Sequence, residues 1–486
     1  MTDPVDPAAP AGGTHGTDPA PPAADPAAPV GGANVTRPAP PAAGQGATDP
    51  AERPARRGAP PLPEDLLPDT AQIGPGGRLS VGGVDLLDLC AEVGTPVFVY
   101  DEVHLRNRCR QAVEAFGDGV AYASKAFFCL AMAQLVHEEG MRIDVSTGGE
   151  LHVALRAGVP AERLVLHGNN KSERELATAL EAGVGRIVVD NFDELDRLDR
   201  LAPAITHRRP RVWVRVTPGI EAHTHEYVQT GQDDSKFGFG MAGGAAAEAV
   251  RRLGRPDSPV ELVGIHAHIG SQIFESSSFE RAVAVLAEFV APLHIDELCI
   301  GGGLGVAYVE GEKAPSIAEW AGAVRGAASA AGLPPSLQLS AEPGRSIAAA
   351  AAITCYTVGT IKAIPGIRTY VSVDGGMSDN PRPVLYGSGY EAFLPRSTRM
   401  GRTFPASVVG KHCESGDMIV RDAWLPADVA VGDVLATPVT GAYGHSMASN
   451  YNKVGRPPVV FVAGGRARVV VRRETDDDLL ALENGL

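Results

Sequence analysis

The chain has 486 residues, of which 44% are hydrophobic and 21% are charged, and its formal net charge at pH 7 is −15. This balance is typical of globular proteins, and the length predicts more than one domain. The acidic character argues against nucleic acid and anionic membrane surfaces as partners, because both would repel it. Six cysteines without a CxxC pair, no secretory signal and no bilayer-spanning apolar run indicate a cytoplasmic protein with reduced thiols.

Residues 1–62 are mainly Ala, Pro, Gly, Asp and Thr, with almost no large apolar side chains. Such a segment cannot bury enough apolar surface to offset the entropy that it would lose on ordering. We therefore predict a disordered N-terminal tail over these residues and leave it out of the fold.

Between residues 103 and 346, short apolar or β-branched runs alternate with segments of helical spacing such as 278–292. Eight strand–helix units predict a (β/α)8 TIM barrel with its reactive groups on the loops after the strands, although an open doubly wound sheet would alternate in the same way. The eight runs are Val120–Ala123, Arg142–Val145, Leu164–Leu166, Ile187–Val189, Val212–Val216, Val263–His268, Leu298–Ile300 and Leu337–Ser340.

Residues 347–486 instead show β-rich runs with tight turns, which predict a β-sandwich or β-barrel domain. The closing runs Val459–Val462 and Ala467–Val471 surround two glycines and predict a hairpin. Residues 75–102 are also strand-like and end in the apolar run before Asp101. We expect them to join the C-terminal β domain, so that the barrel is inserted between two parts of that domain.

Lys125 follows the first predicted barrel strand. A lysine at the catalytic end of a strand, flanked by small apolar residues, can have its pKa lowered by desolvation and can form a Schiff base. A single lysine at a strand end is more often an ordinary surface residue, so this interpretation depends on the other motifs.

His266 and His268 lie on one face of the sixth predicted strand, because alternate residues of a strand point the same way. A flat imidazole covering an aromatic cofactor, with Gly270 and Ser271 open to a phosphate, fits this motif. A zinc site is the weaker alternative, since no third ligand has suitable spacing. We predict no metal.

The last two barrel strands are followed by motifs suited to a phosphate and to a ring nitrogen. Gly301–Gly305 would let backbone amides approach a phosphate closely, although a tight turn would also use glycines. Glu342, in the turn that ends at Arg345, could keep a pyridinium nitrogen protonated; an exposed Glu–Arg pair is the alternative. In the β domain, Cys413 stands beside Glu414, and Tyr443 lies in a glycine-rich segment; a core cysteine and a packed aromatic are their ordinary interpretations.

Taken in order, these motifs resemble the fold-type III pyridoxal-phosphate-dependent decarboxylases, and among them the diaminopimelate decarboxylase family. The resemblance implies an alanine-racemase-like barrel, the cofactor pyridoxal 5′-phosphate, and conversion of meso-2,6-diaminopimelate to L-lysine and CO2, the last step of lysine biosynthesis. It runs from about residue 75 to the C-terminus, through YASKAF, DVSTGGEL, LHGNNKS, EAHTHE (221–226), DSKFGF, HAHIGSQ, GGGLG, AEPGR, DGGMSD, CESGD, TGAYG and SNYN.

The resemblance also implies roles for single residues. Lys125 would hold the cofactor through a Schiff base, His268 would stack on its ring, and Glu342 would pair with the pyridine nitrogen. Tyr443 would touch both cofactor and substrate. The phosphate would be bound by Ser271, Gly302, Gly303, Gly344 and Arg345.

The amino acid end of the substrate that does not react would be bound by a second group of residues. Arginines suit its carboxylate through forked hydrogen bonds, and a carboxylate suits its ammonium group. Cys413 would act near the reacting carbon, and the proton donor is Cys413 or Lys125. The resemblance implies a homodimer with a shared active site, in which the partner subunit supplies the CESGD segment. The substrate-binding residues would be Arg345, Arg382, which here follows a proline, Tyr386, Glu414 and Tyr443.

Four other functions compete with this one. A decarboxylase of the same fold for arginine, ornithine or carboxynorspermidine would not need two arginines and Glu414 for a distal amino acid. An amino acid racemase would not ordinarily place Glu342 at the ring nitrogen. A non-catalytic pyridoxal-phosphate carrier would not need the β domain, and a scaffold would have no reason to gather Lys125, His268 and Glu342 on one barrel face.

Overall fold

The computed structural model describes residues 58–220 and 235–486. Most of the predicted tail and the EAHTHE segment therefore lie outside the described residues. The predicted end of the tail at residue 62 is wrong, because its last residues are already packed. Ala59 forms an antiparallel bridge with Arg402, and Leu62 is buried in the core. Both side chains are apolar, so burying them stabilises the fold.

Eight parallel strands form the predicted barrel, in the spatial order β13-β12-β11-β9-β8-β7-β6-β5. The N–H groups of Ala121 and Ala123 donate to the carbonyls of Ala341 and Pro343 at 3.0 and 3.2 Å, which closes the ring. The barrel prediction is thus confirmed, and the open-sheet alternative is wrong. The strands are β5 (Ala121–Ala123), β6 (Arg142–Val145), β7 (Leu164–Leu166), β8 (Arg186–Val189), β9 (Arg211–Thr217), β11 (Glu261–His266), β12 (Glu297–Cys299) and β13 (Gln338–Ser340), with a short β10 (Phe239–Gly240) beside β9.

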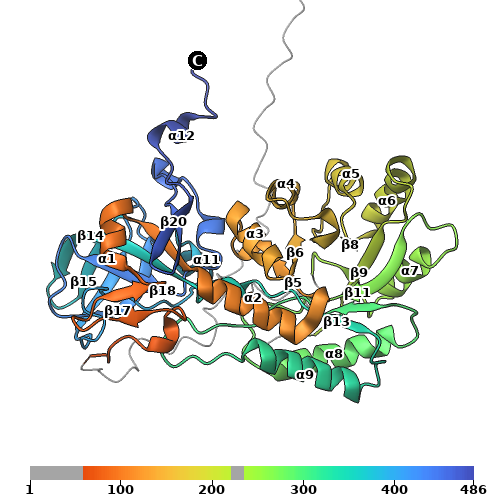
Figure 1. Ribbon diagram of the computed structural model, residues 1–486, viewed down its shortest axis with the longest axis horizontal. Helices are drawn as coiled ribbons and strands as arrows, with labels where there is room; N and C mark the ends of the chain where they lie inside the picture. The colour runs from red at the N-terminus through yellow and green to blue at the C-terminus, as the bar shows by residue number, and fades with distance from the viewer. Residues whose placement is uncertain (1–57, 221–234) are drawn as a thin grey trace, which may run out of the picture. The chain divides into compact units, whose positions relative to one another are not determined.

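Helices cover the outside of these strands, as Figure 1 shows. Their apolar stripes pack on the barrel, while a second small cluster of Ala121, Val165, Val188, Trp213, Val263 and Cys299 fills its interior. None of the described helices has the length and apolar character needed to cross a membrane. The helices are α2 (Glu102–Phe116), α3 (Leu130–Glu138), α4 (Gly148–Arg156), α5 (Glu173–Ala182), α6 (Phe192–Ile205), α7 (Ala245–Leu253), α8 (Ser276–Val290), α9 (Ile317–Ala330) and the short α10 (Arg345–Ala348).

A buried ion pair seals the N-terminal end of the barrel. Arg186 begins β8 and Glu297 begins β12, and the guanidinium Nε donates to the carboxylate at 2.8 Å. The indole of Trp213 donates to the same carboxylate at 2.6 Å. A buried charge is tolerated when it is paired in this way. The loops that follow the strands lie at the opposite end of the barrel.

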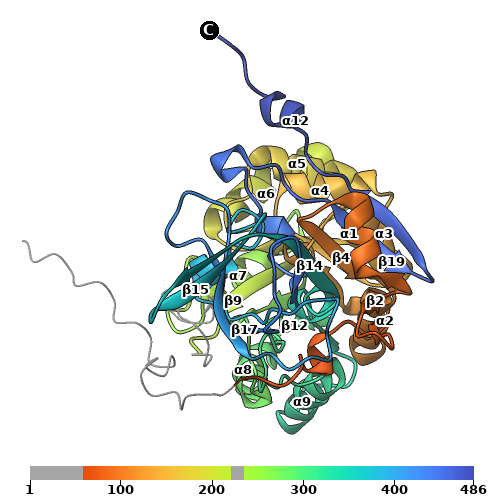
Figure 2. The same ribbon diagram turned by 90° about the vertical axis from the view of Figure 1, so that its left-hand side faces the viewer.

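A second sheet has the order β17-β16-β15-β14-β4-β19-β20, with β18 paired to β14. Strand β4 (Val97–Asp101), which precedes the barrel, lies between β14 and β19 (Figure 2), antiparallel to the first and parallel to the second. The barrel is therefore inserted into the β domain, as predicted, and the hairpin of β19 and β20 is confirmed. The other bounds are β14 (Ala352–Ile364), β15 (Arg368–Val373), β16 (Phe404–Val409), β17 (Met418–Leu425), β18 (Val434–Pro438), β19 (Val459–Ala463), β20 (Arg466–Val471), α11 (Arg382–Tyr386) and α12 (Asp476–Leu480).

We expected the segment 75–102 to consist of strands, but it also contains a helix. Its strands β2 (Leu79–Val81) and β3 (Val84–Asp85) form a separate small sheet with β1 (Gln72–Ile73), and Leu86–Val93 is helix α1. Asp85 caps this helix by accepting hydrogen bonds from the N–H groups of Leu87 and Asp88. Only β4 joins the large sheet.

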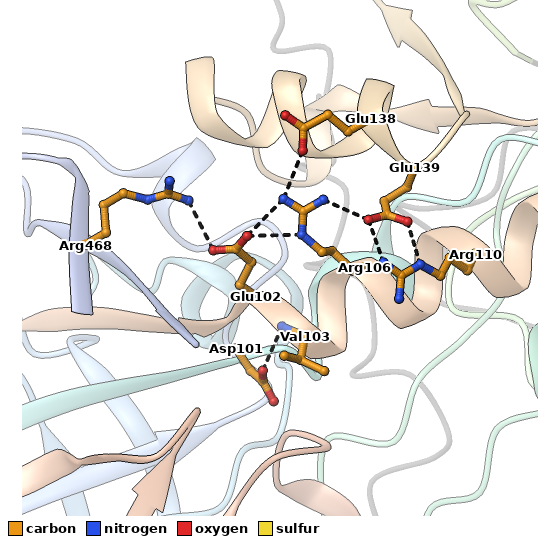
Figure 3. Close-up of polar contacts among 8 residues, drawn as sticks. All are labelled: Asp101, Glu102, Val103, Arg106, Arg110, Glu138, Glu139 and Arg468. Carbon is orange, nitrogen blue, oxygen red and sulfur yellow. Dashed lines mark hydrogen bonds and ion pairs between the residues drawn. The ribbon is translucent and has the colours of Figure 1, made fainter. Parts of the chain in front are cut away.

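A polar cluster ties the barrel to the β domain (Figure 3). Arg106 on α2 contacts Glu102 at 2.9 Å, and it also reaches Glu138 and Glu139 at the end of α3, at 3.0 and 2.7 Å. Glu102 in turn contacts Arg468 on β20 at 3.1 Å. Each partly exposed pair adds little stability by itself. Together they fix α2 against both α3 and β20.

An aromatic joint connects the same two parts next to Lys125. Phe127 stacks on Tyr100 of β4, with ring centroids 4.4 Å apart, and it packs against Phe461 of β19. His445 contacts Phe127 edge-on at 5.9 Å. The chain that carries Lys125 is therefore held directly by the β domain.

The stability of this joint is expected to depend on pH through His445. Burial, followed by the charge of Arg456, lowers the pKa of His445 from 6.5 to about 4. Between these values the unfolded chain binds a proton that the folded chain does not, so the free energy of unfolding should fall as pH decreases from 6.5 to 4. The loss should be up to about 3 kcal/mol. Urea unfolding of wild type and His445→Phe between pH 7 and pH 4.5 measures it; a difference between the two that does not change with pH would contradict the assignment.

Candidate active site

A cavity of about 700 Å³ opens at the C-terminal ends of the barrel strands and is lined by the barrel and the β domain together. Cys413 and Glu414 do not line it and are exposed on the loop between β16 and β17. The structure therefore brings together most of the predicted site residues, but not these two. Those lining the cavity are Lys125, His268, Ser271, Gly302, Gly303, Glu342, Gly344, Arg345, Arg382, Tyr386 and Tyr443.

Lys125 lies in a single 3-10 turn directly after β5, and its side chain is exposed to the cavity. The flanking residues Ser124 and Ala126 are buried. The Ala126 carbonyl accepts a hydrogen bond from the N–H of Tyr443 at 2.8 Å. Tyr443 has a positive φ of 60°, a backbone conformation that is uncommon outside glycine and concentrates at functional sites. One contact thus positions two predicted site residues.

Glu342 is buried after β13 between two histidines. One carboxylate oxygen forms a hydrogen bond of 2.9 Å with Nε2 of His266, and the other lies 2.9 Å from Nε2 of His167. Burial alone would raise the pKa of Glu342, but the charges and hydrogen bonds of His167 and His266 lower it well below its usual value. The carboxyl is therefore ionised over the whole neutral range.

His167 follows β7 and also faces Asp144, whose carboxylate lies 3.7 Å from its Nε2. Burial would lower the pKa of His167, but Asp144 and Glu342 together raise it. Burial lowers the pKa of His266 to about 4. The pKa values of the two histidines are therefore shifted in opposite directions, and His167 holds a proton more readily than His266.

The same cluster could also be interpreted as a metal site. The ligand atoms of His167, His266 and Glu342 lie within 4.8 Å of one another. The zinc alternative considered from the sequence paired His266 with His268, and the structure gives His266 a different neighbour. Both carboxylate oxygens already face imidazole nitrogens, so we interpret the group as a charge cluster that holds Glu342 ionised.

Loops of the barrel meet closely around His268. Nδ1 of His268 accepts a hydrogen bond from the N–H of Gly302 at 3.1 Å, so this amide orients the ring instead of pointing to a phosphate. A Cβ on Gly302 would lie 2.3 Å from the carbonyl of Glu342, and one on Gly303, where φ is +114°, would lie 2.3 Å from the carbonyl of Gly270. Only glycines permit this approach.

Two buried arginines lie at the side of the cavity near the β domain. Arg345 donates to the hydroxyls of Tyr308 at 2.6 Å and Ser271 at 3.0 Å, and Arg382 donates to the hydroxyl of Tyr390 at 2.7 Å. Neither guanidinium has an ion-pair partner within the described part of the chain, although both residues are more than nine-tenths buried. Buried charges are normally paired, so this end of the cavity is built for an anion. Pro381, the residue before Arg382, is the N-cap of α11, and Arg382 is the first residue of this helix.

The chain is similar to known decarboxylases over most of its length. Residues 102–349 match the family described as pyridoxal-dependent decarboxylase, pyridoxal binding domain. A diaminopimelate decarboxylase from Mycobacterium tuberculosis is 49% identical over 427 residues, which cover 84% of this chain and 95% of that protein. The chain belongs to the diaminopimelate decarboxylase family. Solved structures of the family agree: diaminopimelate decarboxylase from M. jannaschii in complex with L-lysine is 32% identical with a TM-score of 0.79, covering 86% of this chain and 98% of that one. The Helicobacter pylori enzyme with L-lysine is 30% identical with a TM-score of 0.74, covering 82% and 98%.

The cofactor of the family, pyridoxal phosphate, fits the residues that line the cavity. Glu342 is an ionised group able to face a ring nitrogen, and Lys125 is an amine exposed to the same space. Ser271 and Gly344 line the same cavity. Gly344 packs closely against the first barrel strand, since a Cβ on it would lie 3.0 Å from the Cβ of Ala123. These residues therefore suit an aromatic, anionic ligand whose carbonyl group can react with a lysine.

Sequence reasoning missed several residues that shape this cavity. Asp144, His167 and Arg215 line it, and Tyr308 and Tyr390 hold its arginines. DVSTGGEL and LHGNNKS were recognised as motifs, but no residue in them received a role. A charged residue inside a strand, as Arg215 is in β9, was a usable signal, because buried strands seldom carry one without a partner.

Proposed function

We propose that this chain removes CO2 from meso-2,6-diaminopimelate to give L-lysine, with pyridoxal phosphate as its cofactor. The observation that carries the proposal is a pair of buried arginines, neither of which is ion-paired to a carboxylate within residues 58–220 and 235–486, in the same cavity as Lys125 and Glu342. A substrate with a second, intact amino acid end would supply the missing anion. The names of the relatives and the L-lysine found in two solved structures of the family support the same substrate and product.

At the reacting end, the residues of this chain hold the cofactor. Lys125 would anchor it covalently, His268 would cover its ring, and Glu342 would keep its ring nitrogen protonated. Ser271, Gly303 and the turn formed by Gly344 and Arg345 would surround its phosphate, while Gly302 sets the orientation of His268. When bound, the cofactor would supply the electron sink for the electrons left on the carbon that loses CO2. That carbon would then take up a proton, for which Lys125 and Cys413 of the partner subunit are the candidate donors.

At the distal end, Arg345 and Arg382 bind the substrate carboxylate through forked, charge-assisted hydrogen bonds. Tyr386, half-buried at the end of α11, and Tyr443, whose ring lies 4.8 Å from the guanidinium carbon of Arg345, complete this part of the cavity. Ornithine and arginine cannot offer a carboxylate here once their only carboxyl group is at the reacting end. This difference favours meso-diaminopimelate over the substrates of sister decarboxylases.

We further propose a cytoplasmic homodimer, working in lysine biosynthesis, in which each cavity is completed by Cys413 and Glu414 of the partner subunit. In their own subunit both residues are exposed and lie outside the cavity. Their loop is nevertheless rigidly built: the carboxylate of Asp417 accepts from the N–H groups of His412 and Met377 at 2.9 and 2.6 Å. All six cysteines are free thiols, which suits a reducing compartment.

The first test is CO2 release from meso-diaminopimelate, L-ornithine and L-arginine, with and without added pyridoxal phosphate. Cofactor-dependent release from meso-diaminopimelate alone supports the proposal. Release from ornithine or arginine instead would move the chain to a sister activity. No release from any of them would leave a carrier of the cofactor as the function.

Mixing two inactive variants tests the shared site. Lys125→Ala and Cys413→Ala damage different halves of each site, so a mixed dimer contains one site with neither change. After random exchange of subunits, about one quarter of wild-type activity should return. Mixtures that stay inactive, although mass spectrometry shows mixed dimers, would contradict a site built from two subunits.

A further inference from the structure

Tyr308 touches both arginines of the cavity. It lies after β12, is 3% exposed, and its hydroxyl accepts the hydrogen bond of 2.6 Å from Arg345. The guanidinium carbon of Arg382 lies over the face of the same ring, 4.2 Å from its centroid. One side chain therefore fixes one guanidinium through its hydroxyl and the other through its π face.

The surroundings of Tyr308 leave it little freedom to move. The carboxylate of Glu312 accepts a hydrogen bond from its backbone N–H at 2.8 Å. The ring of Tyr390 packs edge-on against it with centroids 5.3 Å apart, and the Tyr390 hydroxyl accepts the hydrogen bond of 2.7 Å from Arg382. Neighbouring residues therefore hold both the backbone and the ring of Tyr308 in place.

A tyrosine is better suited to this task than a carboxylate. A carboxylate between the two guanidinium groups would neutralise them and compete with a substrate carboxylate. A phenol accepts a hydrogen bond and offers an electron-rich face without adding a charge, so the positive charge stays available. The nearby carboxylate of Glu391 is instead bound by Arg402 at 2.6 Å.

We propose that Tyr308 is a positioning residue that holds Arg345 and Arg382 as one receptor for a carboxylate, and so determines selectivity for substrates with an intact distal amino acid. The inference rests on the proposed function, because it concerns the end of the cavity assigned to that carboxylate. In this role Tyr308 acts through the two arginines and not on the reacting atoms.

The test is Tyr308→Phe in the full-length holoenzyme. This change removes the acceptor of Arg345 and keeps the ring beneath Arg382. KM for meso-diaminopimelate should rise about 10-fold to 100-fold, because a hydrogen bond to a charged group is lost, while kcat stays within about twofold. Inhibition by L-lysine, which keeps the same carboxylate, should weaken by a similar factor. Inhibition by 1,5-diaminopentane, which has no carboxylate, should not change.

Two comparisons make the result specific. Tyr370→Phe, on β15 and outside the cavity, is the matched control and should leave every constant unchanged. Tyr308→Leu also removes the ring, and KM should rise further than in Tyr308→Phe. The dissociation constant of pyridoxal phosphate, measured by equilibrium dialysis, should be the same for wild type and Tyr308→Phe.

The outcomes separate the inference from the proposed function. A wild-type chain that does not decarboxylate meso-diaminopimelate contradicts the proposed function before any variant is compared. If wild type is active but Tyr308→Phe keeps its KM and its inhibition by L-lysine, the inference is overturned. Weaker binding of pyridoxal phosphate with an unchanged KM would also overturn it, because Tyr308 would then serve the phosphate end. A parallel loss of inhibition by L-lysine and 1,5-diaminopentane would reveal a general collapse of the cavity and would overturn it too.

Discussion

Replacing Lys125 with alanine is expected to lower kcat for meso-diaminopimelate by about 10³-fold or more, and to leave a chain from which the cofactor can be dialysed away. Lys125 is an amine exposed to the cavity, and its neighbours Ser124 and Ala126 are buried. Alanine removes the amine without disturbing these neighbours, so the β domain should still pack on the turn. The measurements are CO2 release and the visible absorbance of the cofactor before and after dialysis.

Two variants separate covalent chemistry from charge. Lys125→Arg keeps a positive charge but cannot anchor the cofactor, so it should be as inactive as Lys125→Ala. Lys313→Ala removes an exposed lysine that does not line the cavity, and it should behave as wild type. A kcat of Lys125→Ala within about tenfold of wild type would contradict the role assigned to this lysine.

The parallel barrel could be predicted from the sequence because its strands are buried on both faces. Runs such as Leu164–Leu166 and Ile187–Val189 are then continuously apolar or β-branched, and their ends are marked by polar or glycine-rich stretches. Closure of the ring could not be predicted in this way. It depends on contacts of Ala121 and Ala123 with Ala341 and Pro343, more than 200 residues apart in sequence.

Helix α1 was missed although its signals are present. Asp85 can cap a helix, Leu86, Leu89 and Cys90 have helical spacing, and Gly94 follows its last turn. The apolar, strand-like run Val97–Tyr100 follows directly, and the strand prediction was extended from it over the whole of residues 75–102. The local signals were therefore sufficient to predict this helix. The prediction failed because the strand pattern was extended beyond the start of β4.

In the cavity, the sequence identified the residues that lie in recognisable motifs. It did not identify the residues that hold these side chains in place. Lys125, His268 and Glu342 all line one space, and their predicted roles remain proposals. Tyr308 and His167 act by holding an arginine and a carboxylate from another strand. Such a role follows from the folded arrangement of separate loops, so no spacing within the sequence announces it.

Glu342→Gln is expected to lower kcat by about 10²-fold to 10³-fold, with KM changed little, because glutamine fills the same space without a negative charge. Only an ionised group can keep a proton on the ring nitrogen that it faces. His167 and His266 hold the pKa of Glu342 well below its usual value, so this carboxylate should stay ionised from pH 8 down to pH 5. Its own protonation should therefore produce no loss of kcat in that range.

Glu342→Asp is the matched variant, since it keeps the charge and shortens the side chain by one methylene. It should lie between wild type and Glu342→Gln in kcat, because one of the two contacts of 2.9 Å to His167 and His266 must lengthen. The pH dependence of kcat for all three proteins and the absorbance of the bound cofactor measure the effect. If Glu342→Gln kept the wild-type kcat, the charge at the ring nitrogen would have to come from elsewhere, and Glu342 with its two histidines would serve only to build the barrel interior.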